Sequence, residues 1–239
     1  MASAKQPVIL ALDAAGLACS VAIGVGDRVA GSERISIVYG QAESLLPLVD
    51  RVIAAAALTP AAIDVVAASV GPGSFTGIRA GLAAARGIAI GVGAPLLGVS
   101  SFAAVAATVP RRGCHRFLLV ALESRREDLY VQLFDQISSP MAEPTAILPA
   151  ALTEAVDAMI GRGRLLVAGD AANRASSALA ERPDTAVLDA SAPDAVGVLQ
   201  AAVSLTRCGK SGNAARPLYL RAPDVTLPAG RRKGKPAPE

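Results

Sequence analysis

Residues 65–81, VVAASVGPGSFTGIRAG, are the stretch of sequence that decides the fold. Residues 65–70 form an apolar run broken only by Ser69, which predicts a buried strand. The triplet Gly71-Pro72-Gly73 predicts a tight turn, and the residues after it predict a helix from about 74 to 91. A buried strand that leads through a glycine turn into a helix is typical of an α/β protein.

Upstream of this stretch, short apolar runs separated by turn signals predict three antiparallel strands, and a helical periodicity follows them. Pro47 is tolerated only in the first turn of a helix, so we expect that helix to begin near Glu43 or Ser44. The expected elements are strands at 8–12, 18–24 and 28–38, a helix up to residue 58, a helical turn opened by Thr59 and Pro60, the strand and helix above, a strand at 96–99 and a helix at 102–108. The order βββαβαβα is that of the ribonuclease-H-like unit, a mixed sheet with helices on both faces.

A second round of the same kind begins after a basic linker at 110–116. Its expected elements are strands at 117–122, 129–135, 165–168 and 186–188 and helices at 152–160, 176–181 and 195–208. The two halves share too little sequence to identify a repeat directly, so the duplication rests on element order. We predict an N-terminal lobe at residues 1–109, a C-terminal lobe at 110–222 and a basic flexible tail at 223–239.

Composition indicates where the protein works. Of the 239 residues 52% are hydrophobic but only 3% are aromatic, so the core must consist of small aliphatic side chains. The three cysteines, Cys19, Cys114 and Cys208, contain no CxxC pair, which fits a reducing compartment. Residues 1–7 lack the apolar core of a secretory signal. We therefore expect a cytoplasmic protein that is not in a membrane.

Charged and metal-binding residues exclude several functions. His115 is the single histidine, so no metal site with two histidines can exist. The net charge of +3 equals the excess at residues 228–239, where Arg231, Arg232, Lys233 and Lys235 outnumber the single acidic residue Glu239. The rest of the chain is neutral and lacks the concentrated basic charge that is typical of a nucleic-acid-binding protein.

The glycine turn admits two interpretations. Free N–H groups at the start of the helix, with Gly73 allowing close approach and Ser74 as N-cap, are suited to binding a phosphate or a carboxylate. Asp13, which closes the first strand, would belong to such a site. The alternative is a tight strand-to-helix turn, with Asp13 as a turn residue. The motif is neither GxGxxG nor a Walker A loop.

Small residues recur on one face of the helix at 74–91. Gly77, Gly81 and Ala84 lie at i, i+4 and i+7, and each glycine inside a helix costs roughly 0.8–1.0 kcal/mol relative to Ala. A smooth face kept at that cost predicts that another backbone packs closely against it. The helix at 44–58 of this chain, a helix of a partner, or both together would fill that role. The candidate partner interface comprises Leu45, Leu48, Val52, Gly77, Gly81 and Ala84.

No self-sufficient active site is predicted. Residues 123–128, ESRRED, carry both signs of charge and lie in the second-lobe hairpin that corresponds to the position of Asp13. A solvated hairpin explains them more simply than a functional site. With one histidine, in an expected linker, there is no nucleophile with a convincing base. We therefore predict no catalytic residue and no metal site.

Several motifs together resemble the TsaB family, also called YeaZ, of tRNA threonylcarbamoyladenosine biosynthesis proteins. The most specific is GPGSFTGIR at 71–79. The others are ILALD at 9–13, CSVA at 19–22, ESLLPL at 43–48, GVSS at 98–101 and PLYLR at 217–221. They follow one another in the family's order along most of the chain.

This resemblance implies an actin-like (ASKHA) fold of two ribonuclease-H-like lobes, each a mixed sheet flanked by helices. It also implies a non-catalytic subunit that pairs with a TsaD-like catalytic subunit and a TsaE-like ATPase. That complex transfers a threonylcarbamoyl group to the adenosine next to the anticodon of ANN-reading tRNAs. The chain would contact tRNA indirectly, form a homodimer when alone, dimerise through its two N-terminal-lobe helices, and bind no cofactor tightly, with ATP or ADP at the interface of the complex.

Two enzymatic alternatives remain open. An M22-type peptidase, as the old glycoprotease name suggests, needs a metal, but Tyr39-Gly40-Gln41-Ala42-Glu43-Ser44 stands where many relatives have His before Ser-Glu. A small actin-like ATPase or phosphotransferase would use Asp13 and the turn at 71–74.

Overall fold

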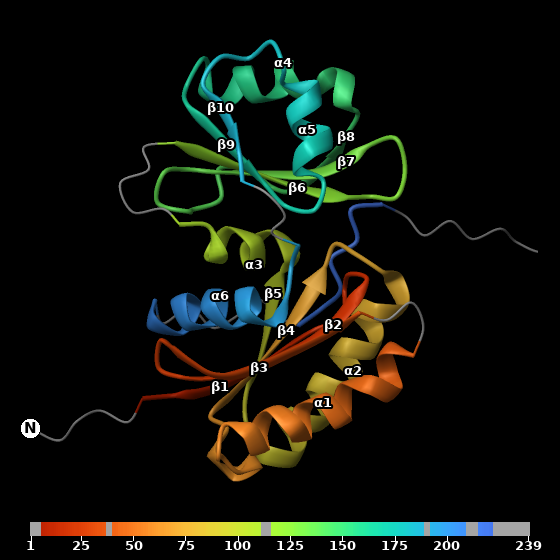
Figure 1. Ribbon diagram of the computed structural model, residues 1–239, viewed down its shortest axis with the longest axis vertical. Helices are drawn as coiled ribbons and strands as arrows, with labels where there is room; N and C mark the ends of the chain where they lie inside the picture. Colours follow the sequence, from red (N-terminus) through yellow and green to blue (C-terminus); the bar gives the residue numbers. More distant parts are fainter. Residues whose placement is uncertain (1–5, 37–39, 111–115, 189–191, 209–214, 222–239) are drawn as a thin grey trace, which may run out of the picture.

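The computed structural model describes residues 6–36, 40–110, 116–188, 192–208 and 215–221. The tail at 223–239, His115, and most of the linker at 110–116 lie outside the described residues. Two lobes are stacked along the longest axis of the molecule, each built on one sheet (Figure 1).

The N-terminal lobe contains the first sheet, in the order β3-β2-β1-β4-β5. Strands β1 and β2 and strands β2 and β3 are antiparallel, whereas β4 is parallel to β1 and to β5. The elements are β1 (Val8–Asp13), β2 (Ala18–Val25), β3 (Arg28–Ser36), α1 (Gln41–Ala55), the 3-10 turn η1 (Pro60–Ala62), β4 (Val65–Gly71), α2 (Phe75–Val92), β5 (Leu96–Ser100) and α3 (Ser101–Thr108).

The C-terminal lobe repeats this topology. Its sheet has the order β8-β7-β6-β9-β10, with the same succession of antiparallel and parallel pairs. Its elements are β6 (Phe117–Glu123), β7 (Leu129–Phe134), β8 (Thr145–Ile147), α4 (Pro149–Ile160), β9 (Leu165–Ala168), α5 (Ala172–Ala178) and β10 (Thr185–Val187), and helix α6 (Ala195–Arg207) follows them in the chain. The predicted duplication and the actin-like arrangement of two mixed sheets flanked by helices are confirmed.

Helices cover both faces of each sheet, which explains the continuous apolar runs of the strands. In β1, Leu10 and Leu12 face a core shared with α1 and α2, whereas Ile9 and Ala11 face a core shared with α3 and α6. Helix α2 has 18 residues and a mean hydropathy of 1.2, so by length and composition alone it could span a membrane. One of its faces nevertheless packs on the sheet.

Helices α3 and α6 form a layer between the two sheets (Figure 1). Phe102 and Val105 of α3 pack on β6, β7 and β9 of the C-terminal lobe. Val198 and Leu199 of α6 pack on the sheet of the N-terminal lobe. Helix α6 lies in the range 110–222 that we expected to form the second lobe, so the chain returns to the first lobe after β10. Its apolar face finds a free sheet surface there.

Four local expectations differ from the structure. Helix α1 begins at Gln41, so Pro47 lies in its second turn, on an exposed side of the helix where water can reach the carbonyl group that loses its partner. Helix α5 spans Ala172–Ala178 instead of 176–181. Helix α4 begins at Pro149 instead of residue 152, and the short strand β8 was not predicted.

Candidate functional site

Asp13 ends β1 at the carboxyl edge of the first sheet, where it pairs with Ser20 of β2. Its side chain is buried, with 2% of the residue exposed. The backbone N–H of Ala15 donates to Asp13 Oδ1 at 3.3 Å, and the side chain of Ser69, on the neighbouring strand β4, also donates to the carboxylate. The carboxyl group is therefore enclosed by its own lobe.

Burial raises the pKa of the Asp13 carboxyl from 3.8 to about 6, because a buried charge loses its hydration. The hydrogen bonds from Ser69 and Ala15 oppose this rise, and the negative charge of Asp194 adds to it. Burial also raises the pKa of the Cys19 thiol to about 11, so this thiol is protonated at neutral pH and is a poor nucleophile.

The glycine turn leads into α2, and backbone from the β1–β2 turn fills it. Ser74 caps the helix by accepting a hydrogen bond from the N–H of Gly77 at 3.2 Å, as its position predicted. The N–H of Ser74 donates to the carbonyl of Ala15 at 2.6 Å. A Cβ on Gly73 would lie 2.3 Å from that carbonyl oxygen. Carbonyl groups of this chain thus occupy the place where the anion interpretation put a phosphate.

The smooth face of α2 is also used within the chain. A Cβ on Gly77 would lie 2.0 Å from the carbonyl oxygen of Ala14, and one on Gly81 would lie 3.5 Å from the Ala14 Cβ. The backbone that packs closely against Gly77 and Gly81 is therefore the β1–β2 turn, which the sequence did not suggest, and helix α1 also contacts α2. Ala84 is partly buried against the same core.

The predicted interface residues of α1 lie in the core of the N-terminal lobe. Leu45 and Leu48 are fully buried and Val52 is 2% exposed. Their side chains contact the sheet and cannot meet a partner while the lobe is folded. Helical periodicity thus identified the inner face of α1, and the structure packs that face on the lobe's own sheet, as is usual for an amphipathic helix.

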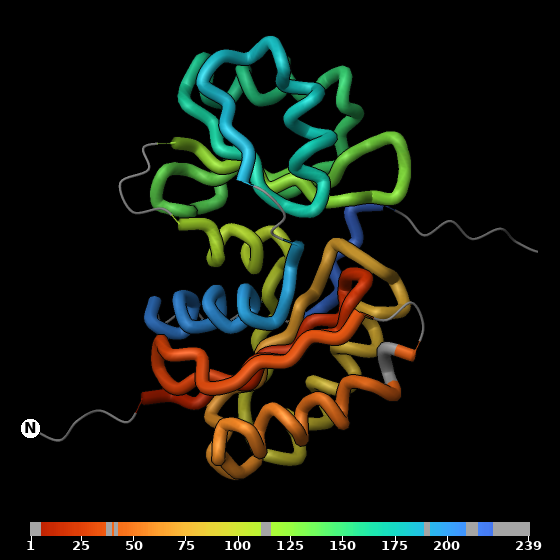
Figure 2. Tube along the Cα trace, in the orientation of Figure 1, coloured from red at the N-terminus to blue at the C-terminus, as the bar shows by residue number. Residues whose placement is uncertain are grey.

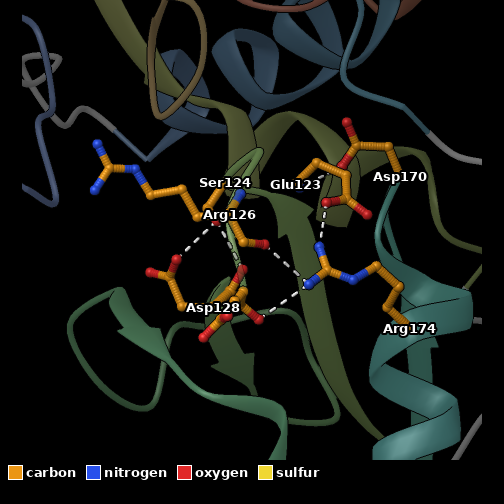
Figure 3. A network of polar contacts seen from close by, with 7 residues as sticks. Glu123, Ser124, Arg126, Asp128, Asp170 and Arg174 are labelled. Atoms are coloured by element: carbon orange, nitrogen blue, oxygen red, sulfur yellow. Dashed lines mark hydrogen bonds and ion pairs between the residues drawn. The ribbon is translucent and has the colours of Figure 1, made fainter.

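A polar network closes the β6–β7 hairpin of the C-terminal lobe (Figure 3). Arg174 of α5 forms an ion pair with Glu123, and its Nη2 donates to the carbonyl oxygens of Arg126 at 3.1 Å and Glu127 at 3.0 Å. The N–H of Glu123 donates to Asp170 at 2.9 Å. The segment that the sequence explained as a solvated hairpin is thus held by an arginine from α5.

The Asp128 carboxyl group of this hairpin is also engaged. The Ser124 hydroxyl donates to Asp128 Oδ1 at 2.9 Å, and Asp128, which is 2% exposed, forms an ion pair with Arg221 at 2.7 Å. Desolvation, with a smaller contribution from the charge of Glu123, raises the pKa of the Asp170 carboxyl. Within the described part of the chain, no three histidine, cysteine or acidic side chains lie close enough to hold a metal ion.

Sequence reasoning missed three contributors to these sites. Ser69 lies in an apolar run and gives no signal, although its hydroxyl contacts both Asp13 and the Ser101 hydroxyl, the latter at 3.3 Å. Arg174 lies far from the hairpin in the sequence. Tyr219 belongs to the quoted PLYLR motif, but its contact with α2 depends on the path of the chain.

Known proteins share both the sequence and the fold. The family model described as TsaD, tRNA N6-adenosine threonylcarbamoyltransferase, matches residues 40–179, more than half of the chain. The tRNA threonylcarbamoyladenosine biosynthesis protein TsaB of Escherichia coli is 32% identical over 122 residues, which are 51% of this chain and 52% of that protein. The chain thus covers about half the length of the curated relatives it matches.

Solved structures extend the likeness over both lobes. A Pseudomonas aeruginosa protein described as similar to the peptidase YeaZ has a TM-score of 0.75 and 26% identity, and the match covers 90% of this chain and all of that one. Component A of the (R)-2-hydroxyglutaryl-CoA dehydratase of Acidaminococcus fermentans has a TM-score of 0.51 and 11% identity over 83% of this chain and 97% of that one, a likeness of fold alone. The chain belongs to the family that the TsaD model describes and, within it, to the TsaB (YeaZ) proteins.

Proposed function

We propose that this chain is a non-catalytic, activating subunit for threonylcarbamoyl transfer to the adenosine next to the anticodon of ANN-reading tRNAs. Its relatives are named as biosynthesis proteins for this nucleoside, and the matching family model describes the transferase. The proposal is further supported because the groups that would form a phosphate site, at Asp13 and the glycine turn, are occupied by this chain's own backbone and side chains.

The partner in this proposal is a TsaD-type protein that docks on the outer face of α1 and α2, acting together with a TsaE-type ATPase. Large apolar side chains are exposed on both helices: Leu46 is 53% exposed on α1, and Phe75 and Ile90 are 43% and 83% exposed on α2. These side chains replace the buried residues that the sequence suggested for the interface.

Two glycines of α2 support the choice of this face as the docking surface. Gly87 and Gly91 are exposed, and a Cβ on either would meet nothing within 4 Å. Each costs the helix about 0.8–1.0 kcal/mol relative to Ala, and nothing among the described residues packs there to explain that cost. A helix of another chain that approaches closely would explain it, since small residues allow a short distance between helix axes.

The interface is tested by placing a large side chain on this face. Gly87→Leu should abolish co-elution with the TsaD-type partner while the midpoint of urea unfolding of the isolated chain does not fall. Ala158→Leu, at an exposed position of α4 in the other lobe, is the matched control and should leave the complex intact. Co-elution of Gly87→Leu with the partner at the wild-type level would reject this face.

The function itself is tested by nucleoside mass spectrometry of bulk tRNA after depletion of the protein. We expect threonylcarbamoyladenosine to disappear and to be restored equally by the wild-type chain and by Asp13→Asn, because Asp13 has no catalytic task in this proposal. An unchanged nucleoside level would reject the role. A loss that only the wild-type chain restores would favour the phosphotransferase alternative.

The proposal also covers the state of the isolated chain. We expect it to work in the cytoplasm, to form a homodimer through the same α1–α2 face, and to bind neither ATP nor ADP tightly, with any nucleotide held at the interface of the complex. Calorimetric titration with ATP should give no heat for the isolated chain. Binding that is lost in Asp13→Asn would contradict this expectation.

A further inference from the structure

Residues 215–221, here called the strap, cross from one lobe to the other. They follow α6 and contain no helix or strand. Figure 2 shows them in dark blue on the right of the molecule, whereas α3, which packs on the second sheet, lies on the left. The two lobes are therefore connected on both sides.

Backbone hydrogen bonds hold the strap to the N-terminal lobe. The N–H of Leu218 donates to the carbonyl oxygen of Val70, near the end of β4, at 2.7 Å. Nη2 of Arg86, in the middle of α2, donates to the carbonyl oxygen of Ala215 at 2.7 Å. The Leu218 side chain also packs on the core that β4 shares with α1 and α2.

Side chains of the first turns of α2 hold the middle of the strap. Nε of Arg79 donates to the Tyr219 hydroxyl at 3.1 Å. The rings of Tyr219 and Phe75 are 5.5 Å apart, and the guanidinium carbon of Arg79 lies 3.7 Å from the centre of the Phe75 ring. This arrangement combines an aromatic pair with a cation–π contact, both of which favour one fixed geometry.

The last two residues of the strap belong to the C-terminal lobe. Leu220 packs against the cluster that joins α3 to the second sheet. Arg221 forms the ion pair with Asp128 in the β6–β7 hairpin, at 2.7 Å. Asp128 is 2% exposed, so its carboxylate depends on this arginine and on the Ser124 hydroxyl for compensation of its charge.

We propose that the strap is a lock that fixes the angle between the two lobes, and that the pair Arg221–Asp128 fastens it. Helix α3 packs between the lobes on one side of the molecule, so that the lobes can tilt about it. The strap lies on the other side and spans the gap that such a tilt would open. Its N-terminal-lobe contacts are with β4 and α2, and its C-terminal-lobe contacts are the packing of Leu220 and the ion pair of Arg221 with a buried carboxylate, so the lobes can tilt when either end is released.

The lock is tested in the isolated full-length chain with two readouts. Hydrogen exchange at the Leu218 amide reports whether the strap is attached, since that amide donates to Val70. A distance between spin labels reports the angle between the lobes. The labels are placed by Ala54→Cys on α1 and Ala158→Cys on α4, both exposed positions, in a chain with Cys114→Ser and Cys208→Ser. Cys19 is buried and is left in place.

Arg221→Ala should raise the exchange rate of the Leu218 amide by about tenfold, because it removes the ion pair with the buried Asp128 carboxylate, and should broaden the distance distribution. Arg221→Lys keeps the charge and should restore most of both. Arg51→Ala removes an exposed arginine that pairs with Glu33, away from the strap, and should change neither. Faster exchange with an unchanged distance distribution would show that the strap is no lock, and unchanged exchange would show that Arg221 does not fasten it.

Discussion

Asp13→Asn should stabilise the protein at neutral pH, although it replaces a buried residue at the end of strand β1 in the first sheet. The folded chain holds the Asp13 carboxyl at a pKa of about 6, against an ordinary 3.8, mainly because of burial. The folded state therefore prefers the protonated form. The contribution of the Asp13 carboxyl to the free energy of unfolding is fully present below pH 3.8, falls as the pH rises, and is lost above about pH 6.

The size of the effect follows from the two pKa values. At about 1.36 kcal/mol per pKa unit, a rise from 3.8 to about 6 corresponds to about 3 kcal/mol of lost stability at pH 7. Asn resembles the protonated carboxyl in shape and cannot ionise. Urea unfolding of both proteins at intervals from pH 4 to pH 7.5 should give a difference in free energy of unfolding that grows by about 2 kcal/mol in favour of Asp13→Asn, because part of the full effect is already present at pH 4.

Subtracting the wild-type curve removes the contributions of all other titrating groups, provided that they are unchanged by the substitution. A difference that stays constant between pH 4 and pH 7.5 would refute the argument that burial dominates at Asp13. So would a variant that becomes less stable relative to the wild type as the pH rises.

Further predictions concern close packing at glycines, a buried arginine and the burial of the cysteines. Gly77→Ala places a Cβ 2.0 Å from a carbonyl oxygen and should lower the free energy of unfolding, measured by urea titration, by about 1–3 kcal/mol. Gly87→Ala places its Cβ in open space and should raise the free energy of unfolding by up to about 1 kcal/mol. Arg182→Met removes a buried arginine that pairs with the partly exposed Asp157 and donates to the carbonyls of Gly161 and Gly163, and should cost about 2–4 kcal/mol; a loss below 1 kcal/mol would contradict this. In a chain with Cys114→Ser, a thiol reagent should modify the exposed Cys208 at once and the buried Cys19 only after unfolding.

The sequence predicted the elements well where a single local signal was strong. The buried run of β4, the glycine turn and the start of α2 lie where the pattern placed them, because a chain reversal and an N-cap depend on neighbouring residues. Boundaries failed where signals competed. Pro47 argued for a late start of α1, but solvent at an exposed carbonyl compensates for the missing hydrogen bond.

The candidate site was predicted in part. Asp13 and Ser74 were predicted to belong to one site, and in the structure each contacts Ala15 of the β1–β2 turn. Their ability to bind an anion depended on whether the turn was empty, and the carbonyl group of Ala15 fills it. No local pattern contains that information, because Ala15 and Ser74 are far apart in the sequence.

The sequence by itself determined the order of the elements, the apolar face of each helix and the family, since periodicity, turn residues and motifs are local properties of the chain. Only the tertiary structure decided which surface each face meets. It packed α6 on the first lobe, turned Leu45 and Gly77 inward, and brought Arg221 to Asp128. These choices depend on which apolar surfaces and buried charges remain to be covered after the sheets have formed, and that is a property of the whole chain.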